Sequence, residues 1–225
     1  MRRNIEREIF ADLRVRPPLV IRADGRGFNK LLRNAEKPYD LGFARSMAGV
    51  VKDFFLHSGL NPSLAFTFSD EVNLLFLEAP FNGRLEKLDS VVSGSLSGLL
   101  SLDLGTAISM DARAILLCHN EIVDYFVERQ DETWGNHVFS YGFYTLIDEG
   151  RSPQQAMAKL RGKKESYIHE MLFQRGINLA QNPCWQRRGI LVYRDKSEVV
   201  DDWDLPLFKS KEGQNLIMMA TKSHI

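Results

Sequence analysis

The segment Ala65–Leu77, with the sequence AFTFSDEVNLLFL, constrains the fold of this chain most strongly. Apolar residues alternate with other residues on both sides of a polar break, which is the period of half-buried β-strands. The break consists of Ser69, Asp70 and Glu71. The pattern therefore predicts two short strands joined by a tight turn that carries two adjacent carboxylates.

The adjacent carboxylates of Asp70 and Glu71 need a physical explanation. Between two apolar strands an ionised carboxylate is costly unless it is solvated, paired or bound to a cation. The pair therefore fits either an ordinary acidic turn or a metal or proton-transfer site on a rigid hairpin. These residues alone leave both interpretations open.

The charge of the chain is balanced overall but not locally. The 225 residues have a formal net charge of zero and are 44% hydrophobic, enough for one large or two small domains. Between Arg151 and Lys196 there are ten Lys or Arg and three Asp or Glu, a local net charge of +7. This asymmetry indicates either a surface for a polyanion or a set of solvated helix faces.

Cysteine usage and hydropathy indicate an intracellular protein. Cys118 and Cys184 are too few for a disulfide framework or a zinc site. The first 15 residues are charged throughout and lack the apolar core of a signal peptide. No apolar run approaches the roughly 18–20 residues that span a bilayer. We therefore expect a soluble, cytoplasmic protein with no membrane partner.

The order of elements in the first half predicts the fold class. Periodicity, capping residues and breakers indicate the following elements in chain order: helix 4–14, strand 19–23, helix 40–58, the central hairpin, helix 85–102 and strand 112–117. After the first helix the order is strand, helix, strand, strand, helix, strand. This order is typical of an α+β, ferredoxin-like domain.

This topology predicts that distant carboxylates converge. In a ferredoxin-like sheet the first and third strands are antiparallel neighbours, so the end of the first lies beside the start of the third. Asp24 follows the first strand, and Asp70 and Glu71 open the third. Two magnesium ions roughly 3.5–4 Å apart, held by such carboxylates, can support phosphoryl transfer.

The loop Asp24–Phe28, with the sequence DGRGF, is a candidate phosphate cradle. Gly25 and Gly27 allow backbone amides to approach phosphate oxygens, and Arg26 adds a charged fork. A glycine-rich turn alone is more often only a tight turn, but the second carboxylate favours the nucleotide interpretation. Lys37 can reach a triphosphate as a point charge, or it can be a solvated loop lysine.

The second half predicts a mainly helical extension. We expect elements at the following positions: helices 120–148, 153–160 and 165–175, a strand at 190–193, a peripheral acidic tail at 197–204 and an edge strand at 214–220. The predicted division is a catalytic core with its N-terminal helix at 1–118 and a helical basic extension at 119–225, packed as one compact unit.

Basic residues of this extension are candidate RNA contacts. They are Lys163, Lys164, Arg187 and Arg188. Trp185 lies beside the two arginines and can stack on a base while they contact phosphates, or it can pack in the core.

Five sequence blocks carry a resemblance to a known family. They are IRADGRGF (21–28), KPYD (37–40), FSDEVNLLF (68–76), DARA (111–114) and the pair Arg129–Gln130. In these blocks and their order, over roughly residues 16–194, the chain resembles the tRNA(His) guanylyltransferase family. Members of that family are similar to the palm domain of DNA polymerases and add nucleotides in the 3′–5′ direction to the 5′ end of tRNA.

The resemblance implies specific roles for the residues above. Asp24 and Asp70 would be magnesium ligands, with the Gly25 carbonyl as a third ligand and Glu71 as a supporting catalytic group. The segment Asp24–Asn29 (Asp24, Gly25, Arg26, Gly27, Phe28 and Asn29), together with Ser69 and Asp70, would bind the nucleoside triphosphate. The resemblance also implies two Mg²⁺ ions, ATP and GTP or another NTP as substrates, tRNA as partner, and a homo-oligomer, either dimer or tetramer.

The chain departs from the family pattern downstream. Eukaryotic members carry His-Ile-Asn-Asn-Leu-Tyr-Asn after the Arg-Gln pair, whereas segment 134–140 here reads WGNHVFS and matches only at Asn136. Trp134 stands where the family histidine would be, and Asn29 also replaces a common histidine. His137 could still act near substrate, although a lone helical histidine is more often structural. These differences favour the guanylyltransferase-like branch, template-directed polymerases that repair truncated tRNA 5′ ends.

Three alternatives remain at this stage. A dedicated enzyme would add G to tRNA(His) without regard to a template. A palm-type nucleotide cyclase would condense NTPs and need no large basic surface. A non-catalytic RNA-binding domain shares the strand order, but the central segment lacks the aromatic K/R-G-F-G-F run that such a domain uses.

Overall fold

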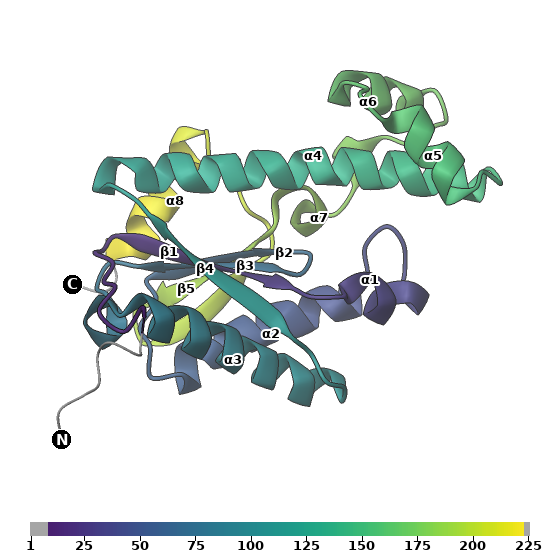
Figure 1. The fold of residues 1–225 in the computed structure, drawn as a ribbon. Coiled ribbons are helices and arrows are strands. Elements are labelled where there is room, and N and C mark those ends of the chain that lie inside the picture. Colours follow the sequence, from purple (N-terminus) through teal and green to yellow (C-terminus); the bar gives the residue numbers. More distant parts are fainter. Residues whose placement is uncertain (1–8, 223–225) are drawn as a thin grey trace.

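A six-stranded antiparallel sheet forms the centre of the computed structural model, which describes residues 9–222 (Figure 1). The strand order is β4-β1-β3-β2-β5-β6. The strands are β1 (Leu19–Gly25), β2 (Leu64–Phe68), β3 (Glu71–Phe76), β4 (Met110–Leu116), β5 (Ile190–Asp195) and β6 (Glu198–Asp202).

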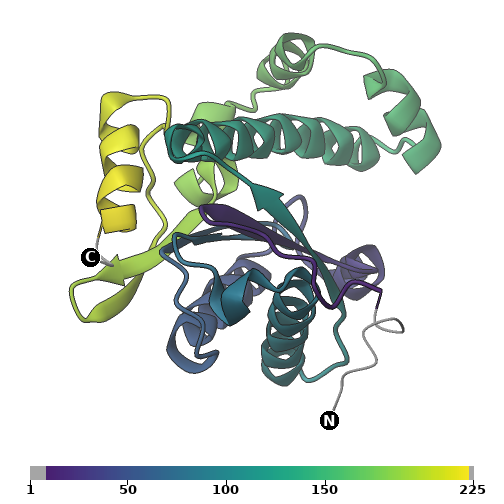
Figure 2. The same cartoon turned by 60° about the vertical axis from the view of Figure 1, so that its left-hand side comes forward.

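Helices cover both faces of this sheet (Figures 1 and 2). The lower layer in Figure 1 is formed by α2 (Leu41–His57) and α3 (Leu85–Leu104). The long α4 (Ile122–Asp148) crosses the other face, and α5 (Pro153–Leu160) and α6 (Glu165–Phe173) extend beyond the sheet at its far end. The remaining helices and 3-10 turns are α1 (Phe28–Leu31), α7 (Cys184–Arg188), α8 (Lys211–Lys222), Leu32–Asn34, Pro80–Gly83, His119–Glu121 and Leu179–Gln181.

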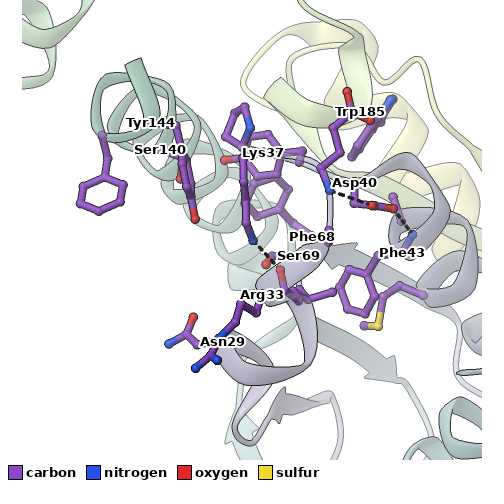
Figure 3. A pocket seen from close by; sticks show the side chains of 18 of the residues that line it. Asn29, Arg33, Lys37, Asp40, Phe43, Phe68, Ser69, Ser140, Tyr144 and Trp185 are labelled. Carbon is purple, nitrogen blue, oxygen red and sulfur yellow. Dashed lines mark hydrogen bonds between the residues drawn. The ribbon is translucent and has the colours of Figure 1, made fainter. Parts of the chain in front are cut away.

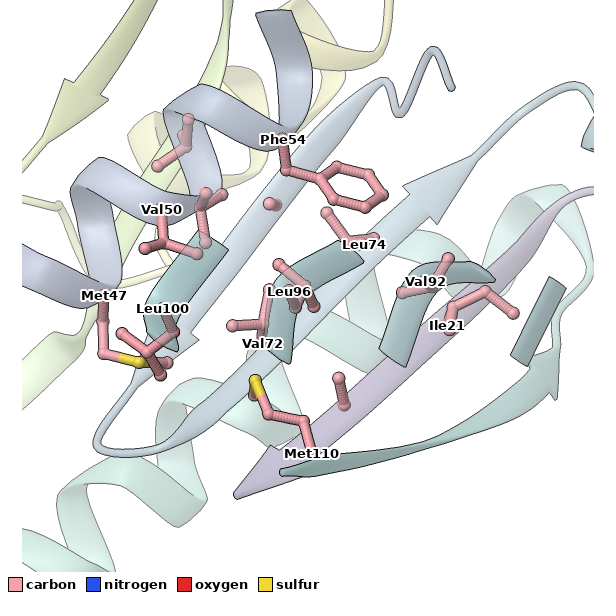
Figure 4. Close-up of a cluster of buried hydrophobic side chains, with 14 of the residues drawn as sticks. Ile21, Met47, Val50, Phe54, Val72, Leu74, Val92, Leu96, Leu100 and Met110 are labelled. Carbon is pink, nitrogen blue, oxygen red and sulfur yellow. The ribbon is translucent and has the colours of Figure 1, made fainter. Parts of the chain in front are cut away.

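The face under α2 and α3 is a continuous apolar core (Figure 4). Ile21 of β1 and Leu74 of β3 meet Phe54 of α2 and Leu96 of α3, and all four side chains are fully buried. Alternation along the strands sends every second residue to this face. The core therefore holds β1 and β3 rigidly at the strand ends that carry the candidate site carboxylates.

The opposite face is apolar at one end and polar at the other. Val20 of β1 and Leu75 of β3 pack with Phe126 of α4. Two and four residues further toward the carboxylates, the same face of β1 carries Arg22 and then Asp24. The polar end of this face, under the middle of α4, is thus where a site can form.

The ferredoxin-like α+β prediction is confirmed. The first four strands have the order β4-β1-β3-β2, and the predicted hairpin turns at residues 69–70. Asp40 is the N-cap of α2, since its carboxylate accepts a hydrogen bond from the backbone N–H of Phe43. Gly59 follows the helix with φ of 68°, a left-handed conformation that favours glycine.

The N-terminal helix predicted at 4–14 is not observed in the part that the structure describes. Residues 1–8 lie outside the described residues, and residues 9–12 form turns. Arg14 instead makes a β-bridge with Arg84, and the backbone N–H of Val15 donates to the carbonyl of Gly83 at 2.8 Å. Pairing with a distant segment has overridden the local helical pattern.

One prediction for the C-terminal end is wrong. Residues 214–220 belong to α8 and not to an edge strand, because Ile217 and Ala220 are three residues apart and both fully buried on one helix face. The acidic tail lies at the outer edge of the sheet, where residues 198–202 form β6 and pair with β5. The Asp201 carboxylate binds the Lys52 ammonium at 2.6 Å.

The C-terminal half contributes two strands to the same sheet as the first half. β5 pairs with β2, so the sheet continues across the predicted division at residues 118 and 119. Within residues 9–222, every helix is too short or too polar to traverse a lipid bilayer.

Gln130 of α4 forms hydrogen bonds with the backbone of the segment before α8. Its side chain is 4% exposed. The amide oxygen accepts from the backbone N–H of Phe208 at 2.7 Å, and the amide nitrogen donates to the carbonyl of Pro206 at 3.1 Å. A buried side chain therefore satisfies backbone groups more than 70 positions away in sequence.

Replacing Gln130 by Met should destabilise the fold without greatly changing the side-chain volume. The free energy of unfolding, measured by urea titration, should fall by about 2 kcal/mol because buried backbone groups lose their partners. Gln174→Met is the matched control, since Gln174 is an exposed residue of similar chemistry near the end of α6. A Gln130→Met protein as stable as the Gln174→Met protein would contradict this assignment.

Candidate functional site

The ends of three strands bring four acidic residues together. In the antiparallel register Asp24 of β1 lies opposite Glu71 of β3 on one side and opposite Asp111 of β4 on the other. The turn residue Asp70 is tied to the end of β1, because the backbone N–H of Gly25 donates to its carbonyl at 3.2 Å. The structure thus places the three candidate catalytic residues, Asp24, Asp70 and Glu71, at one edge.

Gly25 is in close contact with the second carboxylate. A Cβ added at Gly25 would lie 2.3 Å from the ring of Phe28 and 2.9 Å from Asp70 Oδ2. Only glycine fits at this position, and its backbone consequently borders the Asp70 carboxylate. Gly27 has φ of 75° and precedes α1, so the chain turns sharply there. The side chain of Arg26 is exposed, and its backbone N–H donates to Ser109.

The two candidate metal ligands, Asp24 and Asp70, have different electrostatic surroundings. Arg113 lies 3.0 Å from the Asp24 carboxylate, and Arg22 lies 3.6 Å from it. Asp70 has a raised pKa, chiefly because burial disfavours its ionised form and also because the negative charge of Asp24 is nearby. A cation held by both residues would relieve that repulsion.

A metal ion at these strand ends would be coordinated by few protein ligands. Among residues 9–222 no group of three or more His, Cys, Asp and Glu is arranged to hold a metal ion. Asp24, Asp70 and the Gly25 carbonyl supply two carboxylates and one backbone oxygen. This hard-oxygen set suits magnesium, which usually takes one or two carboxylates and keeps waters or substrate phosphates as its other ligands.

A cavity of about 520 Å³ opens beside this edge (Figure 3). Asn29, Lys37 and Ser69, three of the predicted nucleotide-binding residues, line it. Most of its remaining wall is apolar and aromatic, and the aromatic residues are Tyr39, Phe43, Phe68, Phe143, Tyr144 and Trp185. The shape and lining suit a flat, largely apolar group such as a nucleobase.

Lys37 and Asp40 are partly occupied by contacts within the chain. The Lys37 ammonium donates to the carbonyl of Leu32 at 2.7 Å and lies 5.7 Å from the ring centre of Tyr144. The Asp40 oxygens accept from the backbone N–H groups of Phe43 at 2.9 Å and Glu36 at 3.0 Å (Figure 3). These bonds shape the loop that forms one wall of the cavity.

A second, polar cavity of about 230 Å³ lies between the carboxylates and α4. Asp24, Asp70 and Glu71 form its floor, and Arg129 and Asn136 are among its α4 residues. The two cavities share four lining residues, which are Tyr39, Phe68, Ser69 and Ser140. The carboxylates therefore lie next to two adjoining spaces of different polarity.

Trp134 and His137 form part of the packing between α4 and its neighbours. The fully buried imidazole of His137 lies between the rings of Trp134 and Tyr39, at centroid distances of 5.6 and 5.7 Å. Burial, helped by the charge of Arg187, lowers the pKa of His137 to about 4, so it is neutral at pH 7. His137 lines neither cavity, which favours the structural interpretation.

The four predicted RNA contacts lie in different surroundings. Lys163 and Lys164 are exposed in the connection between α5 and α6. Arg187 and Arg188 are partly buried and donate to the carbonyls of Asn182 at 2.9 Å and Leu205 at 2.6 Å. Trp185 also lines the larger cavity and packs against Tyr39.

Several residues around the carboxylates had no assigned role in the sequence pattern. Arg22, Asn73, Arg113 and Tyr125 contact the acidic group or its neighbours. Alternation along β1 and β4 could have placed the two arginines on the face of Asp24. The contact of Asn73 with α4 depends on how the helix crosses the sheet, which no local pattern states.

Two family models match adjoining parts of the chain. The model described as tRNAHis guanylyltransferase matches residues 3–123, and the model of the Thg1 C terminal domain matches residues 120–223. Among curated proteins, a probable tRNA(His) guanylyltransferase of Drosophila melanogaster is 30% identical over 79% of this chain and 67% of its own length. The tRNA(His) guanylyltransferase of Schizosaccharomyces pombe is 28% identical over 92% of this chain and 84% of its own length.

Solved structures agree with this relationship at the level of the fold. A bacterial tRNA(His) guanylyltransferase-like protein in complex with ATP has a TM-score of 0.80 and 21% identity, covering 97% of this chain and 96% of its own. The complex of such a bacterial protein with GTP has a TM-score of 0.77 at 21% identity, with 96% coverage of both chains. The family models together span nearly the whole sequence, and the chain therefore belongs to the tRNA(His) guanylyltransferase family, a family of nucleotidyltransferases.

Proposed function

We propose that this protein is a template-directed 3′–5′ nucleotidyltransferase that adds nucleotides to the 5′ end of truncated tRNA. The observation that carries the proposal is that Asp24, Gly25 and Asp70 meet, and that Asp24 and Asp70 line a polar cavity which adjoins an aromatic one. Family membership supports the reaction class, and the names of the relatives point to tRNA as the acceptor.

The aromatic cavity would receive the base of the incoming nucleotide. Asn29 and Ser69 line this cavity and also flank the glycine loop and the hairpin turn. The loop Asp24–Asn29 would hold the triphosphate with backbone amides and with the exposed guanidinium of Arg26. Solved relatives in complex with ATP and with GTP support a nucleoside triphosphate as ligand.

Asp24, Asp70 and the Gly25 carbonyl would hold two magnesium ions. The raised pKa of Asp70 fits this role, because a carboxylate crowded by burial and by Asp24 gains from a bound cation. When bound, such ions neutralise charge on the reacting phosphate and lower the barrier to its transfer. The chain itself fixes the spacing of the two carboxylates through the register of β1 and β3.

The reaction would join the 3′ oxygen of the bound nucleotide to the phosphorus at the RNA 5′ end. The RNA 5′ end carries a triphosphate or an adenylyl group from ATP. The new O3′–P bond forms as the bond to the leaving pyrophosphate or AMP breaks, and the 3′-hydroxyl passes its proton to water. The polar cavity adjoins the nucleotide cavity and offers Arg129 and Asn136 to the phosphate at the RNA 5′ end. Adjoining cavities of this kind favour transfer between two bound partners.

The residues around the nucleotide favour templated addition over dedicated addition of G. Gly25, Arg26 and Gly27 face phosphates and cannot distinguish bases. The aromatic walls stack on any base, because every base has a π-face. The exposed lysines between α5 and α6 favour a polynucleotide partner over the cyclase alternative, which needs none.

Removing either metal-binding carboxylate should abolish transfer. Asp24→Asn and Asp70→Asn should each lower the rate of 5′-nucleotide addition by on the order of a thousandfold, because loss of a metal ligand forfeits several kcal/mol. Metal-free Asp70→Asn protein should also melt at a higher temperature than wild type at pH 7. The penalty of ionising buried Asp70 is full above its raised pKa and vanishes below the usual carboxyl pKa of about 3.9.

Asp53→Asn is the control, because Asp53 is an exposed carboxylate on α2. It should retain the wild-type rate and melting temperature. Near wild-type addition by either site variant at saturating magnesium would show that the metal assignment is wrong.

The lysines between α5 and α6 should contribute to tRNA binding. Replacing both Lys163 and Lys164 by Ala should weaken tRNA binding and reduce the slope of log affinity against log salt by up to about one for each lost phosphate contact. The affinity for NTP should not change. The double variant Lys209→Ala, Lys211→Ala removes the same charge near the start of α8 and should leave the slope unchanged. Equal slopes for the two double variants would assign Lys163 and Lys164 to the solvated surface.

The added nucleotide should follow the opposing base of the acceptor stem. A set of 5′-truncated tRNAs that differ only at that base, each supplied with all four NTPs, separates the two activities. Templated repair should add G opposite C, C opposite G and U opposite A, since base pairing makes the selection. Addition of G to every member would refute the repair function and support dedicated guanylyl transfer instead.

A further inference from the structure

Asn73 is a fully buried polar residue in the middle of the central strand β3. Its amide nitrogen donates to Glu71 Oε1 at 2.7 Å and to the carbonyl of Phe66 at 3.4 Å. Its amide oxygen accepts from the hydroxyl of Tyr125 at 2.6 Å. A buried amide at a core position is costly unless such bonds satisfy it, and here its shortest donor bond goes to a site carboxylate.

The partners of β3 come from a single face of α4. Tyr125 contacts Asn73, and Arg129, one turn later, lies 3.4 Å from Glu71 Oε1 and 3.5 Å from Oε2. Four residues of helix rise about 6 Å, and two residues of strand rise about 6.6 Å. The spacing of the two pairs therefore matches, so the helix and the strand contact each other at both points.

The hydroxyl of Tyr125 holds the Asn73 amide in this orientation. Burial raises the pKa of Tyr125, so the phenol stays protonated and acts as a donor. The Glu71 carboxylate and the Phe66 carbonyl can only accept, so the Asn73 nitrogen faces them and the Asn73 oxygen is left to accept from Tyr125. A reversed amide would instead place an oxygen against the carboxylate, and the two would repel each other.

Glu71 is thereby held mainly through one of its two carboxylate oxygens. Oε1 receives the 2.7 Å bond from Asn73, whereas Oε2 has the longer 3.5 Å contact with Arg129. Arg129 also pairs with Glu132, so its charge is shared. The carboxylate of Glu71 lines the cavity next to Asp24 and Asp70.

We propose that Tyr125 and Asn73 are positioning residues, which fix the Glu71 carboxylate for the transfer reaction without touching substrate. The inference rests on the proposed function, because Glu71 acts only if the edge of Asp24 and Asp70 is the site of transfer. A hydroxyl on α4 thus controls the rate of the chemical step through an amide in β3.

The test is the steady-state rate of nucleotide addition to a 5′-truncated tRNA by the full chain. Tyr125→Phe keeps the ring and removes the hydroxyl. Its kcat should fall about tenfold while KM for NTP stays within about twofold, because a misplaced catalytic group slows chemistry without weakening ground-state binding. Tyr141→Phe is the matched control, since it removes a hydroxyl bonded to Gln186 at 2.7 Å further along α4.

A double-mutant cycle with Glu71→Ala separates positioning from a general packing effect. If Tyr125 acts through Glu71, the Tyr125→Phe change should have no further effect on kcat in the Glu71→Ala background. Asn73→Asp should lower kcat more than Tyr125→Phe, because it removes the donor and adds a like charge. Thermal melting of each variant identifies any that fail to fold. If Asn73→Asp does not fold, the test rests on Tyr125→Phe.

The outcomes separate a failure of the positioning role from a failure of the proposed function. A Tyr125→Phe protein with wild-type kcat, or with the same loss in both backgrounds, overturns the positioning role while the Asp24 and Asp70 assignment stands. A wild-type protein that adds no nucleotide overturns the proposed function and the positioning role with it. A loss of kcat that disappears in the Glu71→Ala background supports both.

Discussion

The end of β1 pairs with β3 on one side and with β4 on the other, and the other features of the site depend on this double pairing. It places Asp24 between Glu71 and Asp111 and brings the turn at Asp70 against Gly25. An antiparallel register is fixed by the apolar face beneath it, because a slip of one residue would turn every core side chain outward. The hydrophobic core under α2 and α3 therefore determines the distance between the candidate metal ligands.

The opposite face of the sheet combines apolar packing with the polar network of the site. Near Val20 and Leu75 this face is apolar and packs on Phe126, so α4 is anchored there. Further along the same strands the side chains become charged, and α4 passes over them with Tyr125 and Arg129. One helix thus binds an apolar surface with one part and completes a polar network with another. The orientation of the carboxylates depends on the same packing that stabilises the domain.

Local patterns predicted most of the fold and part of the site. Alternation and the Ser69–Glu71 break predicted the hairpin, and the strand order then predicted that Asp24 and Asp70 converge. The pattern failed in residues 214–220, where a short apolar run fits both the helical and the strand period. It also failed at Arg14, where pairing with a distant segment determines the backbone conformation. Asn73 could not be assigned a role from sequence, because an amide within an apolar strand indicates a partner without identifying it.

The strand β5 has a consequence for how this protein can be divided. It covers the edge of β2 through pairs such as Ala65 with Val192 and Phe66 with Leu191. A shortened protein that stops near residue 118 would leave β2 as an open edge with unpaired backbone groups and exposed apolar side chains. Such an edge recruits strands from other molecules and promotes aggregation. Residues 1–118 are therefore unsuited to transfer as a free-standing module, and domain exchange between relatives should keep β5 with the sheet that it covers.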